Sequence, residues 1–480
     1  MKCAMWKMFI LFAIPAALCG AARGADFTPC ADAGAVPALQ GSLCARQVVP
    51  ASYDAGASDT VTLFVRRFPA PRKSRGSVWL VAGGPGESGA SLYSMVGTLR
   101  RAFPDFDLIV PDHRGTGYSS KLCPDEEAAG GPGGMALAGA EWGTCFARLK
   151  AQPELAQRFS ITTAAHDLQL LIGARKPRDR KSLDTKPVYL YGVSYGTQLV
   201  LRALQLGPLP VAGVILDSLV PPQTAPEWDL SRRSFSVDDV GRQVLAQCDA
   251  QASCRDRLGE PAATLYRRVL ALAADNPALL AEVPGKNVKR FLGGLLDVPA
   301  ARARIPYLIK ELEQGRGDEL KAVRALLEHS YAQLGEFAQS PPSIPLVGII
   351  SASENNLRPQ LLAADLTRED EQLLFTSRLP ELLASPTLPL YPRDRYFGKL
   401  PARLPPVLVF HGTLDPKTHY NGALSQVAAL RQVGPVRMVA VAGAPHFILW
   451  SAPACFEQAT RAFVAGRRTG AAPQSCGLPD

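Results

Sequence analysis

Short apolar runs recur along the chain and are separated by segments in which apolar residues follow a helical spacing. The runs that are typical of buried strands occupy residues 60–65, 77–81, 107–110, 188–191, 211–216, 406–410 and 436–441. Segments of helix length lie between most of them, for example residues 91–102 and 162–174. Strands that alternate with helices predict a mostly parallel sheet covered by helices on both faces.

The strand pattern stops after residue 217 and resumes near residue 405. Proline pairs mark both ends of the interruption, and helical spacing dominates within it, as at residues 263–274 and 319–334. We therefore predict an α/β core formed by residues 26–220 and 405–480, with a helical lid inserted over residues 221–404. Residues 26–58 show little periodicity, and we expect them to form an N-terminal extension that precedes the first strand.

The first 25 residues have the pattern of a signal peptide. Lys2 and Lys7 give a positive start, residues 8–19 are apolar, and small residues follow. The apolar run is too short for a membrane helix, and no later segment reaches the length of a membrane span. Lipoprotein anchoring at Cys19 is an alternative, but the bulky Leu18 before it fits a lipobox poorly. We expect a protein exported to the periplasm or the medium.

The cysteines support export. Eight of the ten lie beyond the targeting segment, and an even number in an exported chain favours disulfides. From their proximity along the chain we predict the pairs Cys30–Cys44, Cys123–Cys145, Cys248–Cys254 and Cys455–Cys476. Buried free thiols are the alternative. No C-x-x-C or H-E-x-x-H spacing is present, so no metal is expected.

The net charge adds little to the predictions of fold and export. The formal charge of +9 falls by three, to +6, when Lys2, Lys7 and Arg23 leave with the signal peptide. The densest basic stretch, residues 175–181, contains no aromatic residue and is more typical of a solvated loop than of a nucleic-acid site. Charge therefore gives no reason to expect a nucleic-acid partner.

A candidate nucleophile lies directly after one predicted strand. Residues 192–196 read G-V-S-Y-G, follow the apolar run 188–191 and precede a helical segment. Strand, sharp turn and helix are the context in which G-x-S-x-G forms a nucleophile elbow and exposes its serine. This context favours Ser194 as the nucleophile, although the pentapeptide also occurs in ordinary loops.

An acid and a histidine follow in the order that this chemistry needs. Asp415 lies in the loop after the predicted strand 406–410, and His446 lies just past the predicted strand 436–441. Taken singly, Asp415 is more typical of a turn cap beside Pro416, and His446 is more typical of a surface loop residue. Together, at consecutive strand ends, they predict the base and its orienting carboxylate. Asp217, after an earlier strand, is the rival for the acid.

Backbone amides are expected to bind the oxyanion. One candidate donor is Tyr195, which follows the nucleophile, and the other is Gly84, in the glycine-rich loop after the predicted strand 77–81. Residues 84–89 also match G-x-G-x-x-G, and Asp112 lies some twenty residues on, which outlines a dinucleotide site. That alternative leaves Ser194, Asp415 and His446 unexplained, and export would separate the protein from the NAD pool.

These motifs together carry a family resemblance. G-G-P-G at residues 83–86, D-H-R-G-T-G-Y-S at residues 112–119, the serine elbow, Asp415 and His446 resemble the α/β-hydrolase superfamily. More narrowly, they resemble the proline iminopeptidase and tripeptidyl aminopeptidase group of serine peptidases. Ala82 stands where the shorter iminopeptidases usually have histidine, so the chain is more similar to the longer, secreted type. The resemblance implies that Asp112 and Arg114 are structural.

An aminopeptidase must also hold a free α-ammonium group, for which a carboxylate is suited. Residues 351–356, S-A-S-E-N-N, look like the acid-bearing lid segment of tripeptidyl aminopeptidases, which makes Glu354 a candidate. A helix cap or a solvated acid is the other interpretation of Glu354. Glu87, beside the oxyanion loop, is a second candidate.

The sequence therefore predicts an exported serine aminopeptidase of the α/β-hydrolase fold. Its expected partners are peptide substrates with a free N-terminus, and neither a metal nor an organic cofactor is expected. An esterase or lactonase on the same machinery is the nearest alternative, and a hydrolase-like binding protein without turnover is a more distant one. Epoxide hydrolases and dehalogenases are disfavoured because they use aspartate at the elbow.

Overall fold

The computed structural model describes residues 26–54, 56–128, 140–173, 186–335, 337–384, 388–466 and 476–477. The predicted signal peptide and the basic stretch at residues 175–181 lie outside the described residues.

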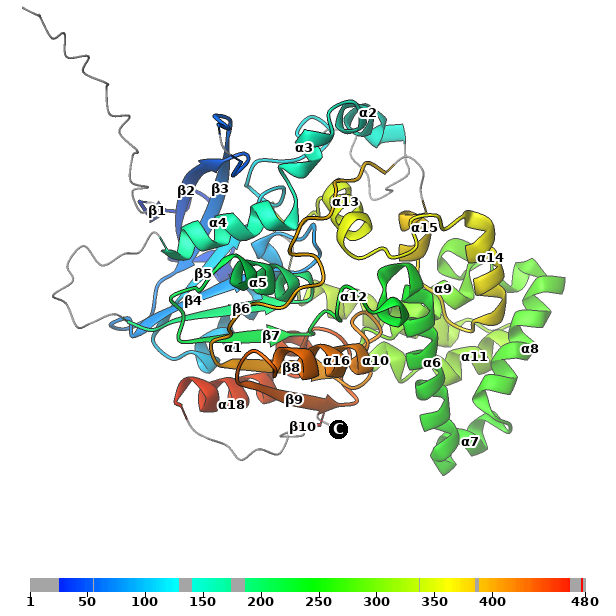
Figure 1. The fold of residues 1–480 in the computed structure, drawn as a ribbon. Coiled ribbons are helices and arrows are strands. Elements are labelled where there is room, and N and C mark those ends of the chain that lie inside the picture. The colour runs from blue at the N-terminus through cyan, green and yellow to red at the C-terminus, as the bar shows by residue number, and fades with distance from the viewer. Residues whose placement is uncertain are drawn as a thin grey trace, which may run out of the picture.

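A single twisted sheet forms the centre of the protein (Figure 1). Its strands are β1 (Thr28–Pro29), β2 (Leu43–Pro50), β3 (Thr60–Phe68), β4 (Gly76–Val81), β5 (Phe106–Asp112), β6 (Val188–Val193), β7 (Gly213–Asp217), β8 (Val407–Gly412), β9 (Val436–Ala442) and β10 (Cys476–Gly477). They lie in the order β1-β2-β3-β5-β4-β6-β7-β8-β9-β10. The strands from β5 to β10 pair in parallel, and β1, β2 and β3 add an antiparallel edge. The predicted, mostly parallel sheet is thus confirmed.

The expectation that strands begin only at residue 60 is wrong. β2 is eight residues long and pairs with β3 along its whole length, from Leu43 opposite Arg67 to Pro50 opposite Thr60. Its exposure alternates, with Ala45 and Val49 buried and Val48 exposed, but its residue types do not follow this pattern, since the exposed Val48 is apolar and the half-buried Gln47 is polar. Such a strand lacks the strict alternation of polar and apolar residues by which strands are recognised.

Alternate residues of the central strands enter two separate apolar layers. On β4, Trp79 and Val81 belong to one layer, whereas Val78 and Leu80 belong to the other. The core helices that cover the sheet or flank it are α1 (Val96–Ala102), α2 (Gly143–Ala151), α3 (Pro153–Gln157), α4 (Ile161–Gly173), α5 (Tyr195–Leu206), α16 (Tyr420–Leu430), α17 (Ile448–Ser451) and α18 (Pro453–Val464). α4, α5 and α16 cover the first layer, and α1 and α18 cover the second. Burial on both faces explains why these strands are continuous apolar runs.

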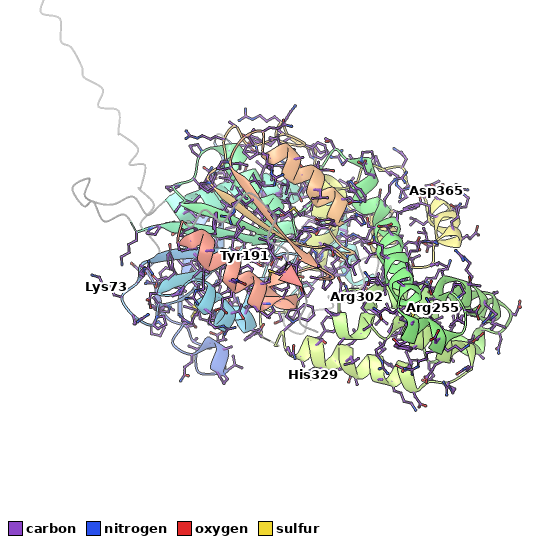
Figure 2. All side chains as sticks on the ribbon, turned by 90° about the horizontal axis from the view of Figure 1, so that it is seen from below. Lys73, Tyr191, Arg255, Arg302, His329 and Asp365 are labelled. Atoms are coloured by element: carbon purple, nitrogen blue, oxygen red, sulfur yellow. A yellow bond between two sulfur atoms is a disulfide. The ribbon has the colours of Figure 1, made fainter. Side chains whose placement is uncertain are left out.

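Helices fill the chain between β7 and β8, and we call this segment the lid. They are α6 (Arg233–Ala250), α7 (Ala252–Leu258), α8 (Ala262–Asp275), α9 (Val288–Leu295), α10 (Pro299–Arg302), α11 (Ile305–Glu313), α12 (Asp318–Ala332), α13 (Ile344–Glu354), α14 (Ala363–Gln372) and α15 (Leu379–Leu383). Most of them form a body beside the sheet, on the right of Figure 1, with an apolar core that includes Val240, Leu265 and Leu308. In Figure 2, Tyr191 lies within the sheet region, whereas Arg302 lies where the lid meets the core.

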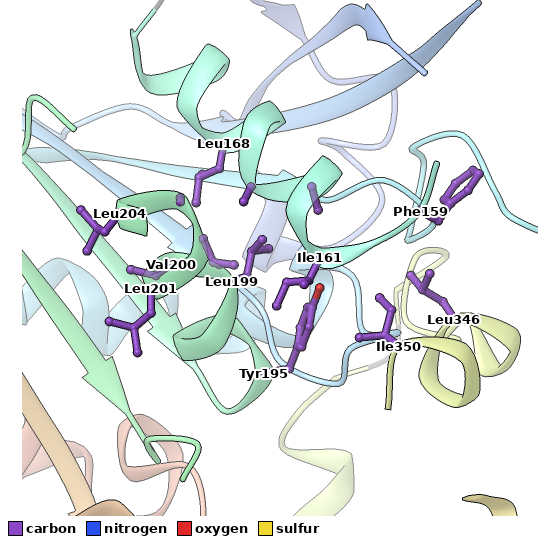
Figure 3. Close-up of a cluster of buried hydrophobic side chains, with 14 of the residues drawn as sticks. Phe159, Ile161, Leu168, Tyr195, Leu199, Val200, Leu201, Leu204, Leu346 and Ile350 are labelled. Atoms are coloured by element: carbon purple, nitrogen blue, oxygen red, sulfur yellow. The ribbon is translucent and has the colours of Figure 1, made fainter. Parts of the chain in front are cut away.

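One lid helix belongs to the core instead. Leu346 and Ile350 of α13 lie in the same apolar layer as Ile161 of α4 and Leu199 of α5, and Figure 3 shows these side chains grouped together. Gly115 makes the approach possible, because a Cβ there would lie 2.6 Å from Leu346 Cδ2. The lid is therefore anchored beside α5, the helix that directly follows Ser194.

The four predicted disulfide pairings are confirmed: Cys30–Cys44, Cys123–Cys145, Cys248–Cys254 and Cys455–Cys476. Both groups of closely spaced potential metal ligands found among the described residues contain one of these cysteine pairs, whose sulfurs are engaged in the disulfide. Within the described residues, no helix combines the length and the apolar character that crossing a bilayer requires.

The packing of α13 generates a stability prediction. Leu346 is fully buried, so Leu346→Ala should lower the free energy of unfolding by about 2 to 5 kcal/mol through lost burial and the cavity left behind. Leu362, also in the lid, is 64% exposed, and Leu362→Ala should change that free energy by less than about 0.5 kcal/mol. Urea unfolding of both variants checks this, and equal losses would contradict the anchoring role of α13.

Candidate active site

Ser194 lies at a sharp turn between β6 and α5. Its backbone adopts φ 54° and ψ −124°, a strained conformation for a residue with a side chain. Glycines on either side make the turn possible: a Cβ at Gly192 would lie 2.5 Å from Gly196 O, and a Cβ at Gly196 would lie 2.6 Å from the carbonyl oxygens of Val81 and Ala82. The G-x-S-x-G spacing therefore has a steric cause, and it projects the serine beyond the strand end.

Ser194 opens onto a cavity of about 660 Å³ at the carboxyl ends of the parallel strands. The core contributes Ser194, His446 and the loop after β4, while the lid contributes side chains such as Trp228, Arg233 and Tyr331. Of the residues predicted from the sequence, the structure brings Ser194, His446, Gly84, Tyr195 and Glu87 to this cavity. A cavity of this size, roofed by an insert, is typical of a small-molecule or peptide site.

Asp415 lies directly behind His446. Its Oδ2 is 2.8 Å from His446 Nδ1, and the Thr418 hydroxyl donates to the same oxygen, also at 2.8 Å. The backbone amides of Lys417 and Thr418 donate to Oδ1. Burial alone would raise the pKa of Asp415, but the charge and hydrogen bond of His446, with help from His411 and the Thr418 amide, hold that pKa well below its usual value. The carboxylate stays ionised and holds the imidazole through Nδ1, which leaves Nε2 for proton transfer.

The rival acid, Asp217, has a different place. Its two oxygens accept hydrogen bonds from the backbone amides of Ile448 and Leu449 at 2.8 Å, and from the hydroxyls of Ser218 and Tyr191. Burial raises the pKa of Asp217. Asp217 thus caps α17, the short helix just after His446, while Asp415 contacts the imidazole itself.

His411 supports the acid loop and was missed in the sequence. Its Nδ1 accepts from the Leu219 amide at 3.1 Å, and its Nε2 lies 2.5 Å from the Thr418 carbonyl oxygen, to which it donates. Burial lowers the pKa of His411 to about 4, so the ring is neutral near pH 7. Residues 411–418 read H-G-T-L-D-P-K-T and include both supporting residues, His411 and Thr418. Residue type alone, however, indicates a catalytic role only for the carboxylate of Asp415.

The two expected oxyanion donors lie in the loop after β4, which carries Gly84, and at the start of α5, which carries Tyr195. Gly84 has φ +112°, which favours glycine, and a Cβ there would lie 2.4 Å from the Gly86 nitrogen. Among the described residues, neither the Gly84 amide nor the Tyr195 amide has a hydrogen-bond acceptor. Both residues line the cavity, so the two amides are available to a substrate oxygen.

Glu354 does not line the cavity, contrary to the expectation for an ammonium ligand. It is buried at the end of α13, where its Oε2 lies 3.1 Å from Arg202 Nη2 and 2.9 Å from Gln223 Nε2. The sequence prediction puts Glu354 in the lid, but its position at the end of α13 directs its side chain toward α5. Its carboxylate is already satisfied by a buried ion pair.

Glu87 meets the requirement better. It lines the cavity and is exposed there, without a hydrogen bond or an ion pair to any described residue. A Cβ built on Gly83 would lie 3.4 Å from Glu87 Oε2 and 3.2 Å from Ser194 Cβ, so the carboxylate and the nucleophile flank the same glycine. The cavity thus holds, beside the candidate nucleophile, a carboxylate without a hydrogen bond that lies within the electrostatic reach of Lys417.

A family model and known proteins match most of this chain. The family model described as "alpha/beta hydrolase fold" matches residues 76–453. The chain is 24% identical to the serine protease Hip1 of Mycobacterium tuberculosis and of Mycobacterium bovis, over 94% of this chain and 90% of the relative.

Solved structures with the same fold are more distant. A proline iminopeptidase from Mycobacterium smegmatis aligns at 13% identity and a TM-score of 0.39, covering 88% of this chain and 98% of that one. An esterase from Thermogutta terrifontis aligns at 15% identity and a TM-score of 0.35, covering 88% and 100%. With a family model matched over most of its length, a nucleophile elbow and a mostly parallel sheet, the chain belongs to the alpha/beta hydrolase fold family.

Proposed function

We propose that this protein is an exported serine peptidase that removes residues from the free N-terminus of peptides. The observation that carries the proposal is the placement on one cavity of Ser194, at a strained elbow, and of His446, whose Nδ1 is bound by the buried Asp415. Similarity to a serine protease over almost the whole chain supports peptide-bond hydrolysis. The four disulfides support export, since such pairs persist in oxidising compartments.

The residues have separate roles in the proposed reaction. Ser194 Oγ attacks the scissile carbonyl while His446 Nε2 takes its proton, and the imidazolium then protonates the leaving amine. Asp415 holds the histidine tautomer and stabilises its charge. The amides of Gly84 and Tyr195 donate to the oxyanion of the tetrahedral intermediate. Water then hydrolyses the acyl-enzyme with the same base.

Glu87 is the proposed ligand of the substrate α-ammonium group. Its free carboxylate lies beside the nucleophile, whereas the carboxylate of Glu354 is committed to Arg202. The lid covers the cavity and favours chain ends over folded proteins. The proposal therefore moves the ammonium site from the lid to the loop after β4.

Ser194→Ala should abolish both labelling by a fluorophosphonate probe and hydrolysis of alanyl-, prolyl- and tripeptidyl-naphthylamides. Loss of the nucleophile leaves only binding and the oxyanion donors, so kcat should fall by roughly a thousandfold or more. Ser91, which also lines the cavity, provides the matched control through Ser91→Ala. If the wild type cleaves nitrophenyl esters but no amide, the protein is an esterase. Absence of both labelling and turnover would indicate a binding protein.

Asp415→Asn should lower kcat by roughly ten-thousandfold, because an amide cannot hold the histidine in the reactive tautomer. Asp217→Asn is the matched comparison. It should lower Tm by removing the cap of α17 while reducing kcat by about tenfold or less, because Asp217 does not contact the imidazole. Single-turnover kinetics and thermal unfolding measure the two effects. The reverse ranking of the kcat losses would assign the acid to Asp217.

Glu87→Gln should raise KM about tenfold for peptides with a free N-terminus relative to their N-acetylated forms, because a charge-assisted hydrogen bond is lost. Glu282→Gln, on the exposed surface of the lid, is the control for the change of charge. Glu354→Gln should lower Tm without altering this KM ratio. A shift of the ratio in Glu354→Gln, and none in Glu87→Gln, would return the ammonium site to the lid.

A further inference from the structure

An arginine of the lid faces the cavity without a partner. Arg233 is the first residue of α6 and lines the same cavity as Ser194 and His446. Within the described parts of the chain, its guanidinium makes no ion pair and donates no hydrogen bond.

Several arginines on the outside of the lid have acid partners. Arg242 pairs with Asp238 at 2.5 Å, Arg304 pairs with Glu319 at 2.6 Å, and Arg358 pairs with Glu369. Arg233 differs from these three in that it lines the cavity and has no acid partner among the described residues.

The acids nearest to Arg233 bind other groups, although Oδ1 of Asp297 is buried without a hydrogen-bond partner among the described residues. Asp415 is bound to His446, and Asp297 forms an ion pair with Lys417 at 3.0 Å. Arg302, at the junction of lid and core in Figure 2, also lies within the electrostatic reach of Asp297. Burial lowers the pKa of Arg233 because these two carboxylates do not make up for its lost hydration. The guanidinium of Arg233 is therefore left without an ion pair of its own at this side of the cavity.

A guanidinium held partly out of water and without an anion is costly, and a substrate anion would offset that cost. Its planar set of donors matches a carboxylate in a two-point contact. We propose that Arg233 is a specificity residue that binds a carboxylate group of the substrate. This inference rests on the proposed peptidase function for the identity of the ligand, but the site itself is defined by the unpaired cation.

Two chemical sources can supply such a carboxylate. One is the C-terminal α-carboxylate of a short peptide, and the other is an aspartate or glutamate side chain near the scissile bond. In the first case Glu87 and Arg233 would bind the two ends of one zwitterionic peptide and so limit its length. In the second case the enzyme would accept long chains that have an acidic residue at one position.

Kinetics on matched substrates separate these sources. Alanine peptides of two to five residues are compared as free acids and as C-terminal amides, and amidated peptides with glutamate are compared with their glutamine analogues. The wild type should show kcat/KM about tenfold or more higher for the anionic member of one of these pairs. Arg233→Gln should remove that preference, and Arg233→Lys should retain part of it.

Arg232→Gln is the matched control. Arg232 precedes Arg233 directly but stacks over the Phe235 ring at 5.4 Å and does not line the cavity. This variant carries the same change of charge and should keep the full preference. Equal losses of kcat/KM for anionic and neutral substrates in Arg233→Gln would indicate a structural role and overturn the proposal.

A binding measurement keeps the test independent of turnover. In Ser194→Ala protein, calorimetry compares two pairs of ligands: N-acetyl-alanyl-alanine with its C-terminal amide, and N-acetyl-glutamate amide with N-acetyl-glutamine amide. In one of these pairs the charged ligand should bind about tenfold or more tighter than its uncharged analogue. The difference should vanish when Arg233→Gln is added. If the wild type hydrolyses nothing while this difference persists, the peptidase proposal fails and the carboxylate site stands. Equal binding of charged and neutral ligands would overturn the site even in an active peptidase.

Discussion

The geometry of the site depends on one buried carboxylate. Asp415 accepts two backbone amides on Oδ1 and the Thr418 hydroxyl and His446 on Oδ2, so its acceptor positions are filled by the loop that carries it and by the imidazole. A fully buried carboxylate is tolerated only with such compensation. Because β8 and β9 are parallel neighbours, the acid loop and the histidine loop leave the sheet side by side, and Leu414 donates its amide to Ala444 O at 3.0 Å. Gly412 permits this approach, since a Cβ there would lie 2.2 Å from the carbonyl oxygens of Ala444 and Pro445.

The sequence predicts the parts of the protein that strand burial and steric demands determine. Strands buried on both faces are continuous apolar runs, and the glycines of the elbow are required by contacts under 3 Å, so both are recognisable without coordinates. Strand β2 is not, because an apolar residue, Val48, occupies an exposed position and a polar one, Gln47, a half-buried position, so the polarity of its residues does not alternate. The direction of a lid side chain is also invisible: Glu354 and its neighbour Asn355 lie at the same helix end, yet only Asn355 lines the cavity. Arg233 has no motif, and its significance appears only from the absence of a partner among the described residues.

The buried carboxylate of Glu354 joins the lid to the core. Arg202, on the nucleophile helix α5, contacts Glu354 from α13, Asp394 from the chain that returns to β8, and the Thr162 hydroxyl of α4. An arginine has several donors, so one side chain in one orientation can form hydrogen bonds to three segments at once. An apolar side chain forms no such directional bonds. Removal of one partner would leave a buried charge unsatisfied, so the network favours a single position of the lid on the core. The apolar contact of α13 stabilises the attachment of the lid, and the hydrogen bonds of Arg202 fix the position of the lid on the core.

The same docking prepares the oxyanion loop. On one side, Asp112 accepts the Gly89 amide at 2.8 Å, and on the other the lid donates the Ser343 amide to Gly86 O at 2.9 Å. Gln339 of the lid joins the two sides, because its side-chain Nε2 donates to Asp112 while its backbone carbonyl oxygen accepts from the Ser88 hydroxyl. Donors that are fixed before the substrate arrives stabilise a developing oxyanion without the cost of reorganisation. The lid therefore also positions the loop that carries Gly84, because this loop is held between the sheet and the lid.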